Sequence, residues 1–378
     1  MISHIGVLTP HYPAPHYPER GAFVERLVRQ WSARGVVCDV VAPVGVPMLL
    51  RGFSRAAEAM DLAGGQVIYP YHLSFGNKMI AGVNLHRVTQ RAFVRAALRG
   101  AARLRVPELY YGKFLFRGGE AALEAGERYG RPAFADLGES KSFDRLPGSA
   151  KRDAEAIAAG LTGIVTVSER LRDEVLRLGA APEKVEVIPN DVDTERFRPM
   201  DRTEARRRLG LPEEAFIVAF TGHFIERKGP LRVLSAVRSL PGEVYGLFFG
   251  RGAQAPEGER VLHAGPVPNE ELPVWLNAAD LFALPTLAEG HCNAVNEAAA
   301  CGLPLVTSDI EDLRGQADPS FSLLVDPNDV SQLAEGIQRL REDAELRSRM
   351  SEAAAQAFHG GTAASRAEKI LDFMEKRC

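Results

Sequence analysis

The sequence predicts an α/β protein made of two doubly wound, Rossmann-like parallel-sheet domains. The chain has 378 residues, which is too long for one ordinary core and right for two. Apolar strand-like runs alternate with helix-period segments, and a Pro-bounded stretch at 189–199 interrupts this alternation before it resumes. We therefore expect domains at 1–193 and 194–358, facing a deep cleft, with a C-terminal helix at 362–378 packing back on the first domain.

The first domain opens with a strand, a helix and a second strand. Residues 2–8 form a compact apolar run, and a Pro-rich loop follows to Gly21. Residues 22–33 carry apolar side chains at helical spacing, Gly35 ends that helix, and 36–42 is the next apolar run. Further strands are expected at 132–135, 163–167 and 184–188 in the first domain, and at 216–221, 246–249, 260–264, 281–284, 305–308 and 322–325 in the second.

Composition excludes several classes of protein. Hydrophobic residues make up 46% and charged residues 25%, and the net charge of −3 points to no particular partner. No apolar run reaches the roughly 18–20 residues that span a bilayer, and the N-terminus lacks the features of a signal peptide. The four cysteines form no CxxC pair, so we expect free thiols in a reducing cytoplasm.

Known nucleotide and metal motifs do not occur. No GxGxxG follows the first strand, and GxxxxGK[ST] is not found, which disfavours a dinucleotide dehydrogenase and a P-loop ATPase. The histidines are scattered and HExxH is lacking, so we expect neither a metal site nor a cofactor.

Two glutamates separated by seven residues mark the strongest candidate site. Glu289 lies in a loop with Gly290 after the apolar run 281–285, and Glu297 lies about a turn into a helix that ends at Gly302. A strand, a glycine-bearing loop and a helix N-terminus can hold phosphate through backbone N–H groups. Carboxylates do not bind phosphate but accept hydrogen bonds from the hydroxyl groups of a ribose or a hexose. A phosphate site next to two such carboxylates therefore indicates a nucleotide-sugar. The alternative is a solvated helix face.

A second candidate segment follows the first strand of the second domain. In Phe220-Thr-Gly-His-Phe-Ile-Glu-Arg-Lys-Gly-Pro230, Arg227 and Lys228 lie in a glycine-bounded loop before a helix. Two cations there could neutralise a departing nucleoside diphosphate, and Gly222 would let the backbone approach it. The alternative is an exposed basic turn.

A basic stripe is the third feature. Residues 62–107 contain no Asp or Glu but seven Lys and Arg, namely Lys78, Arg87, Arg91, Arg95, Arg99, Arg103 and Arg105. Because a step of four residues drifts by only about 40° around a helix, the five arginines from 87 to 103 form one slowly winding stripe. Such a stripe suits a membrane surface or an anionic acceptor. The alternative is a solvated helix over the sheet, and nucleic acid is disfavoured because aromatic stacking residues are lacking.

Together these segments resemble the retaining glycosyltransferases of family 4, which have the GT-B architecture, over nearly the full chain. The family's Glu–seven–Glu motif corresponds to Glu289 and Glu297, and its Gly-rich loop to 222–229. Its linker motif is similar to Val187-Ile-Pro-Asn-Asp-Val-Asp193, its acceptor-side loop to Gly21-Ala-Phe-Val-Glu25, and a strand end to Thr166-Val-Ser-Glu169.

The resemblance implies a role for each of these residues. Glu297 would hold the ribose hydroxyls, and Glu289 would contact the transferred sugar near its anomeric carbon. Lys228 with Arg227 would hold the diphosphate, helped by amides of His291, Cys292, Asn293 and Ala294. Such enzymes generally need no metal and retain the anomeric configuration.

The chain departs from the family pattern at three places. His223 stands where the family has an arginine, and Arg227 would take over that charge. His291, Cys292 and Asn293 replace the usual Phe-Gly-Leu and should reshape the sugar pocket. The family's histidine in the first domain is not evident, so Asp136 or Glu139 would contribute to the acceptor side with Gly21, or would be plain loop residues.

The expected function is transfer of a hexose-type sugar from a UDP- or GDP-sugar to a hydroxyl acceptor. The second domain would bind donor and the first acceptor. The stripe favours a glycolipid acceptor in surface polysaccharide assembly and a cytoplasmic protein that associates with the inner face of the membrane. The alternatives are a small soluble acceptor (an antibiotic core or a sugar phosphate), a nucleotide-sugar epimerase and a non-catalytic nucleotide-sugar sensor.

Overall fold

The computed structural model describes residues 1–14, 20–46, 64–75, 79–80, 83–359 and 365–378. The chain divides into two compact units, one made of Met1–Pro189 with Ala364–Cys378 and the other of Asn190–Ala363. The division thus falls between 189 and 190, whereas the sequence suggested 193 and 194. Lys78 of the basic stripe and residues 362–364 of the expected last helix lie outside the described residues.

The first unit is built on a seven-stranded sheet in the order β11-β10-β9-β8-β1-β2-β4, and every pairing in it is parallel. The strand order reverses between β1 and β8, the place where doubly wound sheets bind ligands. The strands are β1 (His4–Leu8), β2 (Val37–Val41), β4 (Val67–Ile68), β8 (Leu109–Lys113), β9 (Ala133–Leu137), β10 (Gly163–Thr166) and β11 (Val185–Val187).

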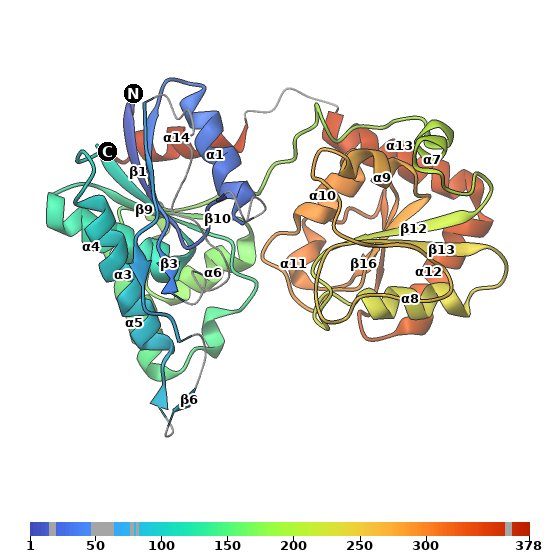
Figure 1. Cartoon of the computed structure of the whole chain (residues 1–378), viewed down its shortest axis with the longest axis horizontal. Helices are drawn as coiled ribbons and strands as arrows, with labels where there is room; N and C mark the ends of the chain where they lie inside the picture. The colour runs from blue at the N-terminus through green and yellow to red at the C-terminus, as the bar shows by residue number, and fades with distance from the viewer. Residues whose placement is uncertain (15–19, 47–63, 76–78, 81–82, 360–364) are drawn as a thin grey trace. The chain divides into compact units, whose positions relative to one another are not determined.

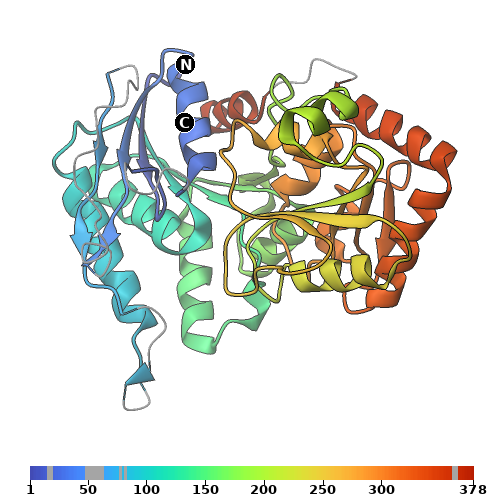
Figure 2. The same ribbon diagram turned by 45° about the vertical axis from the view of Figure 1, so that its right-hand side comes forward.

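Helices cover both faces of the first sheet. Figure 1 shows α1 and α14 on one face and α3, α4 and α5 on the other, and α14 lies beside α1 in Figure 2 as well. Short strand pairs and turns complete the unit. The helices are α1 (Ala22–Ser32), α3 (His86–Ala101), α4 (Glu120–Tyr129), α5 (Gly148–Gly160), α6 (Glu169–Arg177) and α14 (Arg366–Glu375). The short strands are β3 (Val44–Gly45), β5 (Tyr71–His72), β6 (Met79–Ile80) and β7 (Val83–Asn84). The short helical turns are η1 (Phe114–Gly119), η2 (Phe143–Arg145) and η3 (Pro182–Lys184).

Helix α14 belongs to the first unit although it follows the second in sequence. Ser365 caps it in a reciprocal capping box with Glu368. The indole Nε1 of Trp31 on α1 donates to the Ala367 carbonyl at 3.0 Å, and Ile370 and Phe373 are fully buried. These contacts make α14 part of the hydrophobic core of the first unit.

The second unit has a six-stranded parallel sheet in the order β14-β13-β12-β15-β16-β17. Its central strands are apolar and buried except for Thr221 at the end of β12, as expected for a parallel sheet covered on both faces. The strands are β12 (Phe216–Thr221), β13 (Val244–Phe249), β14 (Val261–Gly265), β15 (Leu281–Leu284), β16 (Leu305–Ser308) and β17 (Ser322–Val325).

The helices of the second unit also lie on both faces. Figure 1 shows α8 and α12 on one side of the sheet and α9, α10 and α13 on the other. Helix α8 begins at Pro230, directly after Gly229, whose φ of 75° suits glycine. The helices are α7 (Arg202–Leu209), α8 (Pro230–Ser239), α9 (Leu272–Asn277), α10 (Asn293–Ala300), α11 (Glu311–Arg314), α12 (Val330–Glu342) and α13 (Ala344–His359).

The predicted pair of doubly wound parallel-sheet units is confirmed. Sequence reasoning missed the central strand β8, whose Leu-Tyr-Tyr-Gly-Lys has too few apolar aliphatic residues to stand out. Within the part of the chain that the structure describes, no helix is both long and apolar enough to cross a membrane.

Candidate functional site

The loops that follow β12 and β15 meet at the carboxyl edge of the second sheet. These two strands are neighbours, with Val218 paired to Leu281, and the strand order reverses between them. The backbone N–H of Leu287 donates to the Arg227 carbonyl at 2.8 Å, which ties the loops together. Both candidate segments of the sequence therefore meet at the ligand-binding edge of this sheet.

Lys228 and Glu289 form an ion pair at this junction. Lys228 Nζ lies 2.5 Å from Glu289 Oε1, and Arg227 Nη1 lies 3.4 Å from the same oxygen. The Thr286 hydroxyl donates to it at 2.7 Å. Glu289 is only 5% exposed, so these donors offset the cost of burying its charge.

The glycine-bounded loop is shaped to present these cations. A Cβ atom on Gly222 would lie 3.6 Å from Lys228 Cδ, so the glycine lies directly beside the lysine side chain. The Arg227 guanidinium donates to the Ala288 carbonyl, and Arg232 Nη2 donates to the Pro285 carbonyl at 2.8 Å. His223 is exposed. Arg227, not His223, thus brings positive charge to Glu289.

Side chains at and just after α11 hold the loop after β15. Asp312 accepts from the Glu289 backbone N–H at 2.9 Å, and Gln316 accepts from the Cys292 N–H at 2.8 Å. Gln316 also donates to the Cys292 carbonyl at 3.0 Å and to Asn296 Oδ1 at 2.9 Å. Sequence reasoning missed both residues; their four-residue spacing just after β16 is the only signal in the sequence that marks them.

Cys292 lies at the start of α10, next to the ion pair. Its thiol is buried, and Lys228 Nζ lies 4.0 Å from Sγ. Burial raises the pKa of this thiol to about 11, although the charge of Lys228 opposes the shift. The thiol therefore stays protonated at neutral pH and acts as a small apolar group beside the ion pair.

The remaining residues of the Glu–seven–Glu segment lie along the loop and α10. Gly290 is buried, while His291 and Ala294 are half-buried. Asn293 is exposed and accepts a hydrogen bond at 2.9 Å from Asn190, in the linker motif. Glu297 lies one turn into α10 and is half-buried, so its ribose role stays a prediction.

Asp136 is the centre of a buried ionic cluster in the first unit. Both of its oxygens accept from the Arg366 guanidinium, at 2.8 and 2.9 Å. Lys113 Nζ lies 2.9 Å away, and the Tyr111 hydroxyl donates at 2.5 Å. Burial alone would raise the pKa of Asp136, but the charges of Arg366 and Lys113 outweigh it and lower the pKa. Asp136 lies in strand β9 and anchors α14, which leaves its carboxylate little capacity for an acceptor.

Glu139 and Gly21 lie at the carboxyl edge of the first sheet. Glu139 follows β9, and its oxygens accept from the N–H groups of Leu115 at 2.7 Å and Gly138 at 2.9 Å. Burial raises the pKa of Glu139 to about 7. Gly21 begins α1 with φ of 74°, and a Cβ atom there would lie 2.5 Å from the His11 carbonyl oxygen. An acceptor role for each stays a prediction.

The basic stripe is an exposed face of α3 and the turn after it. Arg87, Arg91, Arg95, Arg99 and Arg103 are all exposed. Arg87 pairs with Asp153 at 2.6 Å, and Arg99 donates to the Tyr71 carbonyl at 3.2 Å. The opposite face of α3 buries Phe93, Val94 and Ala97. Part of the stripe is therefore neutralised internally, and its binding to a membrane stays a prediction.

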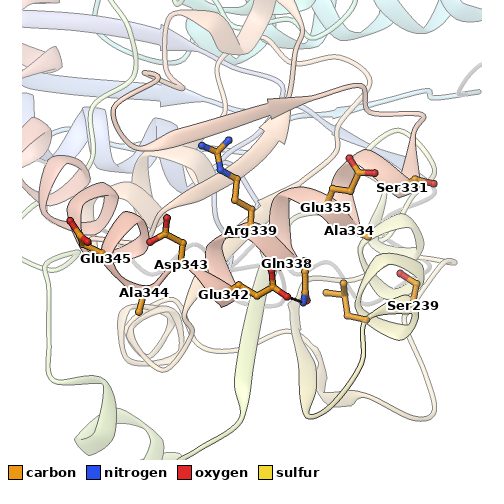
Figure 3. Close-up of a pocket in the computed structure, with 11 residues that line it drawn as sticks. Ser239, Ser331, Ala334, Glu335, Gln338, Arg339, Glu342, Asp343, Ala344 and Glu345 are labelled. Atoms are coloured by element: carbon orange, nitrogen blue, oxygen red, sulfur yellow. Dashed lines mark hydrogen bonds between the residues drawn. The ribbon is translucent and has the colours of Figure 1, made fainter.

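A separate surface hollow lies along α12, between α8 and the start of α13. Figure 3 shows its lining, where Gln338 donates to Glu342 and the side chains of Glu335, Arg339, Asp343 and Glu345 lie along α12 and the start of α13. Residues of the loops after β12 and β15 do not line this hollow. Within the described ranges, no group of three or more His, Cys, Asp and Glu is placed to hold a metal ion.

The second unit matches a known family. Residues 201–357 match the family of glycosyl transferases group 1. A D-inositol 3-phosphate glycosyltransferase 1 of Catenulispora acidiphila is 34% identical over 229 residues, which are 52% of this chain and 55% of that protein. The putative teichuronic acid biosynthesis glycosyltransferase TuaC of Bacillus subtilis is 26% identical over 361 residues, 89% of this chain and 88% of that protein.

Solved structures share the fold of the whole chain. Sucrose-phosphate synthase of Thermosynechococcus elongatus superposes with a TM-score of 0.77 at 18% identity, covering 99% of this chain and 98% of that one. HepE of Anabaena, solved in complex with UDP and glucose, has a TM-score of 0.74 at 17% identity and full coverage of both chains. The two sheets and these likenesses define a GT-B protein. Residues 201–357 of the second unit are thus similar to the group 1 glycosyltransferases, and the chain spans about half the length of the D-inositol 3-phosphate relative.

Proposed function

We propose that this protein transfers a hexose-type sugar from a UDP- or GDP-sugar to a hydroxyl acceptor. The observation that carries this function is the Lys228–Glu289 ion pair, 2.5 Å long, where the loops after β12 and β15 meet beside the start of α10. Relatives in sequence are glycosyltransferases, and the fold neighbour HepE has been solved with UDP-glucose. Both support a nucleotide-sugar as donor.

The cations would stabilise the departing nucleoside diphosphate. Lys228 and Arg227 share the Glu289 carboxylate in the free protein, and phosphate oxygens would compete for the same donors. During transfer the bond between the anomeric carbon and the phosphate oxygen breaks, and the acceptor oxygen bonds to that carbon. The acceptor's proton leaves with the nucleoside diphosphate or to solvent. We propose that the step is metal-independent, because protein cations supply the charge, and that it retains configuration, in line with the family resemblance.

Two kinds of acceptor have support. The name of the teichuronic acid relative and the exposed stripe on α3 favour a glycolipid in surface polysaccharide assembly. We propose that this acceptor would bring the protein, in the cytoplasm, to the inner face of the membrane. The name of the D-inositol 3-phosphate relative favours a small phosphorylated acceptor.

A transfer assay tests the function. After thermal melting with UDP, GDP and ADP has selected the base, release of nucleoside diphosphate is followed with and without acceptor. Lys228→Met should lower kcat by about 10²–10³, since one lost donor costs roughly 2.7–4 kcal/mol of transition-state stabilisation. Arg208→Met, which removes an exposed charge on α7, is the matched control and should behave as wild type.

Other outcomes would contradict the proposed function. An isomerised nucleotide-sugar formed without acceptor would make the protein an epimerase. Tight binding of the nucleotide-sugar with no release in any acceptor mixture would make it a sensor.

A further inference from the structure

Basic side chains from several elements gather at the carboxyl edge of the first sheet. His11 follows β1, Arg20 lies just before α1, His72 ends β5 and Arg117 lies in the turn after β8. The Phe93 ring lies 5.5 Å from the His72 ring and 5.9 Å from the Arg117 guanidinium. We call His11, Arg20, His72 and Arg117 the basic cluster.

Of the residues that the structure describes, no carboxylate pairs with either arginine of the basic cluster. Arg117 is half-buried. Arg20 Nη2 donates to the Pro10 carbonyl, whereas its Nη1 is buried and has no hydrogen-bond partner in the described structure. Burial lowers the pKa of both guanidinium groups without a carboxylate to offset it. Burying N–H donors without an acceptor costs folding free energy, and a bound anion would accept hydrogen bonds from them.

Desolvation and the positive charge of the two arginines lower the pKa values of the neighbouring histidines, His11 and His72. Partial desolvation of the imidazole and then the charges of Arg20 and Arg117 lower the pKa of His11 to about 4, although this residue is exposed. Burial lowers the pKa of His72, and the same two arginines lower it further. Both arginines therefore lie close to both histidines, and the cluster carries positive charge that the described residues do not balance.

The backbone at Arg117 is strained. Its φ of 66° and ψ of −73° match a γ-turn that is rare for residues with a side chain, near about +75° and about −65°. Glycine adopts this conformation freely, and Gly118 and Gly119 follow directly. A strained arginine beside two glycines indicates that the guanidinium is needed at this place, as strain tends to be kept at functional sites.

The position of the cluster is that of a ligand site. Strands β1 and β8, where the strand order reverses, are paired from Ile5–Leu109 to Leu8–Gly112. Gly21, at the start of α1, packs against the His11 backbone, so the N-terminus of this helix lies beside the cluster. The positive end of the helix adds to the attraction for an anion.

We infer, on the basis of the function proposed above, that the basic cluster binds a phosphate group carried by the acceptor. The phosphate oxygens would accept from Arg20 and Arg117 and hold the acceptor at the switch point of the first sheet. A soluble sugar phosphate and a lipid phosphate both carry such a phosphate group. The two tests below distinguish these two acceptors.

The first test uses glycerol 3-phosphate as probe and glycerol as its neutral match, with affinity measured by calorimetry. Wild type should bind glycerol 3-phosphate but not glycerol. Arg117→Gly should bind it at least tenfold more weakly while its thermal midpoint does not fall, because glycine relieves the backbone strain. Arg128→Gln removes an exposed charge on α4 and should bind as wild type.

The second test uses vesicles of phosphatidic acid, with phosphatidylcholine vesicles as control. Binding that Arg117→Gly abolishes would place the phosphate on a lipid, and binding of glycerol 3-phosphate alone would place it on a soluble acceptor. Equal binding by wild type and Arg117→Gly in both tests, or none by wild type, would overturn the inference.

These measurements test phosphate binding by the basic cluster independently of the function proposed above. They need no sugar transfer, so Arg117-dependent binding would stand even if transfer were never found. Binding is repeated in Lys228→Met to exclude the site in the second unit, and the same affinity is expected there.

Discussion

The Thr286 hydroxyl and the Glu289 carboxylate form a buried hydrogen bond of 2.7 Å at the edge of the second sheet. The accepting oxygen is the one that also pairs with Lys228. Thr286 is fully buried directly after β15, and its backbone carbonyl accepts from the Ser308 hydroxyl at 2.7 Å. Thr286 therefore sets the position of Glu289, and through it that of the Lys228 ammonium group.

Thr286→Val should disturb this arrangement without changing the volume of the side chain. A hydrogen bond to a charged group contributes about 1.5–3 kcal/mol, so the free energy of unfolding should fall by about that amount. Transfer activity should fall as well, while Thr286→Ser should recover most of it. Activity of Thr286→Val equal to wild type would show that Glu289 needs no such support.

Glu297→Ala should weaken binding of the nucleoside diphosphate, because a carboxylate that accepts from ribose hydroxyls is lost. Titration calorimetry with the free nucleoside diphosphate measures the change, and a charge-assisted hydrogen bond predicts roughly 1.5–3 kcal/mol. Glu335→Ala, at an exposed position on α12, is the control. An affinity unchanged by Glu297→Ala would remove the ribose role.

Arg366→Met should destabilise the first unit strongly. The variant leaves Asp136 buried with Lys113 and Tyr111 alone, and breaking a buried ion pair costs about 3–5 kcal/mol. Arg377→Met, just after the same helix, removes a partly exposed side chain that donates to the Glu183 carbonyl, and should cost about 1 kcal/mol or less. Urea unfolding followed by tryptophan fluorescence compares the two, since Trp31 packs on α14.

The contribution of Glu139 to stability should fall between about pH 4.5 and pH 7. Burial raises its pKa in the folded protein to about 7 from 4.5, so over this range the folded state holds a proton that the unfolded state has released. The free energy of unfolding contributed by this group therefore decreases as pH rises. His11 acts in the opposite sense, since its folded pKa is lowered to about 4.

Glu139→Gln isolates the contribution of that single group. Urea unfolding of wild type and variant at pH 5, 6, 7 and 8 should give a difference in stability that changes up to about pH 7 and then levels off. A constant difference over this range would show that the carboxyl of Glu139 is ionised throughout.

Replacing Arg91, Arg95 and Arg99 together by glutamine should weaken binding to anionic vesicles. Each basic residue near such a surface contributes about 1 kcal/mol, so the partition coefficient should fall about 100-fold. The control replaces Arg207, Arg208 and Arg238, three exposed arginines of the second unit. If both triple variants bind vesicles as wild type does, the stripe on α3 is only a solvated face.

The alternation of apolar runs was enough to predict both parallel sheets. Runs such as Phe216–Thr221 and Leu281–Leu284 are apolar and end at glycine or proline, so they match the observed strands at both ends. Strand β8 was missed because Tyr110, Tyr111 and Lys113 look half-exposed in sequence, although Tyr111 and Lys113 are buried in the ionic cluster with Asp136. Their burial depends on Arg366, more than 200 residues away in sequence.

The candidate site was predictable where its residues follow the strands of the second sheet. Lys228 and Glu289 each follow a strand, and the parallel topology alone brings the ends of β12 and β15 together. Thr286, Asp312 and Gln316 were missed because they act by holding the backbone or another side chain, and such support depends on tertiary contacts. The strain at Arg117 was also missed, since an arginine before two glycines does not by itself predict a positive φ.

The return of α14 to the first unit has a consequence for how the protein is made. Residues 190–363 form one continuous unit and can fold on the ribosome as soon as they emerge, whereas the first unit needs residues synthesised after the second. Its core is complete only when Arg366 pairs with Asp136 and the Ala367 carbonyl accepts from the indole of Trp31. The part that is synthesised first is therefore completed last.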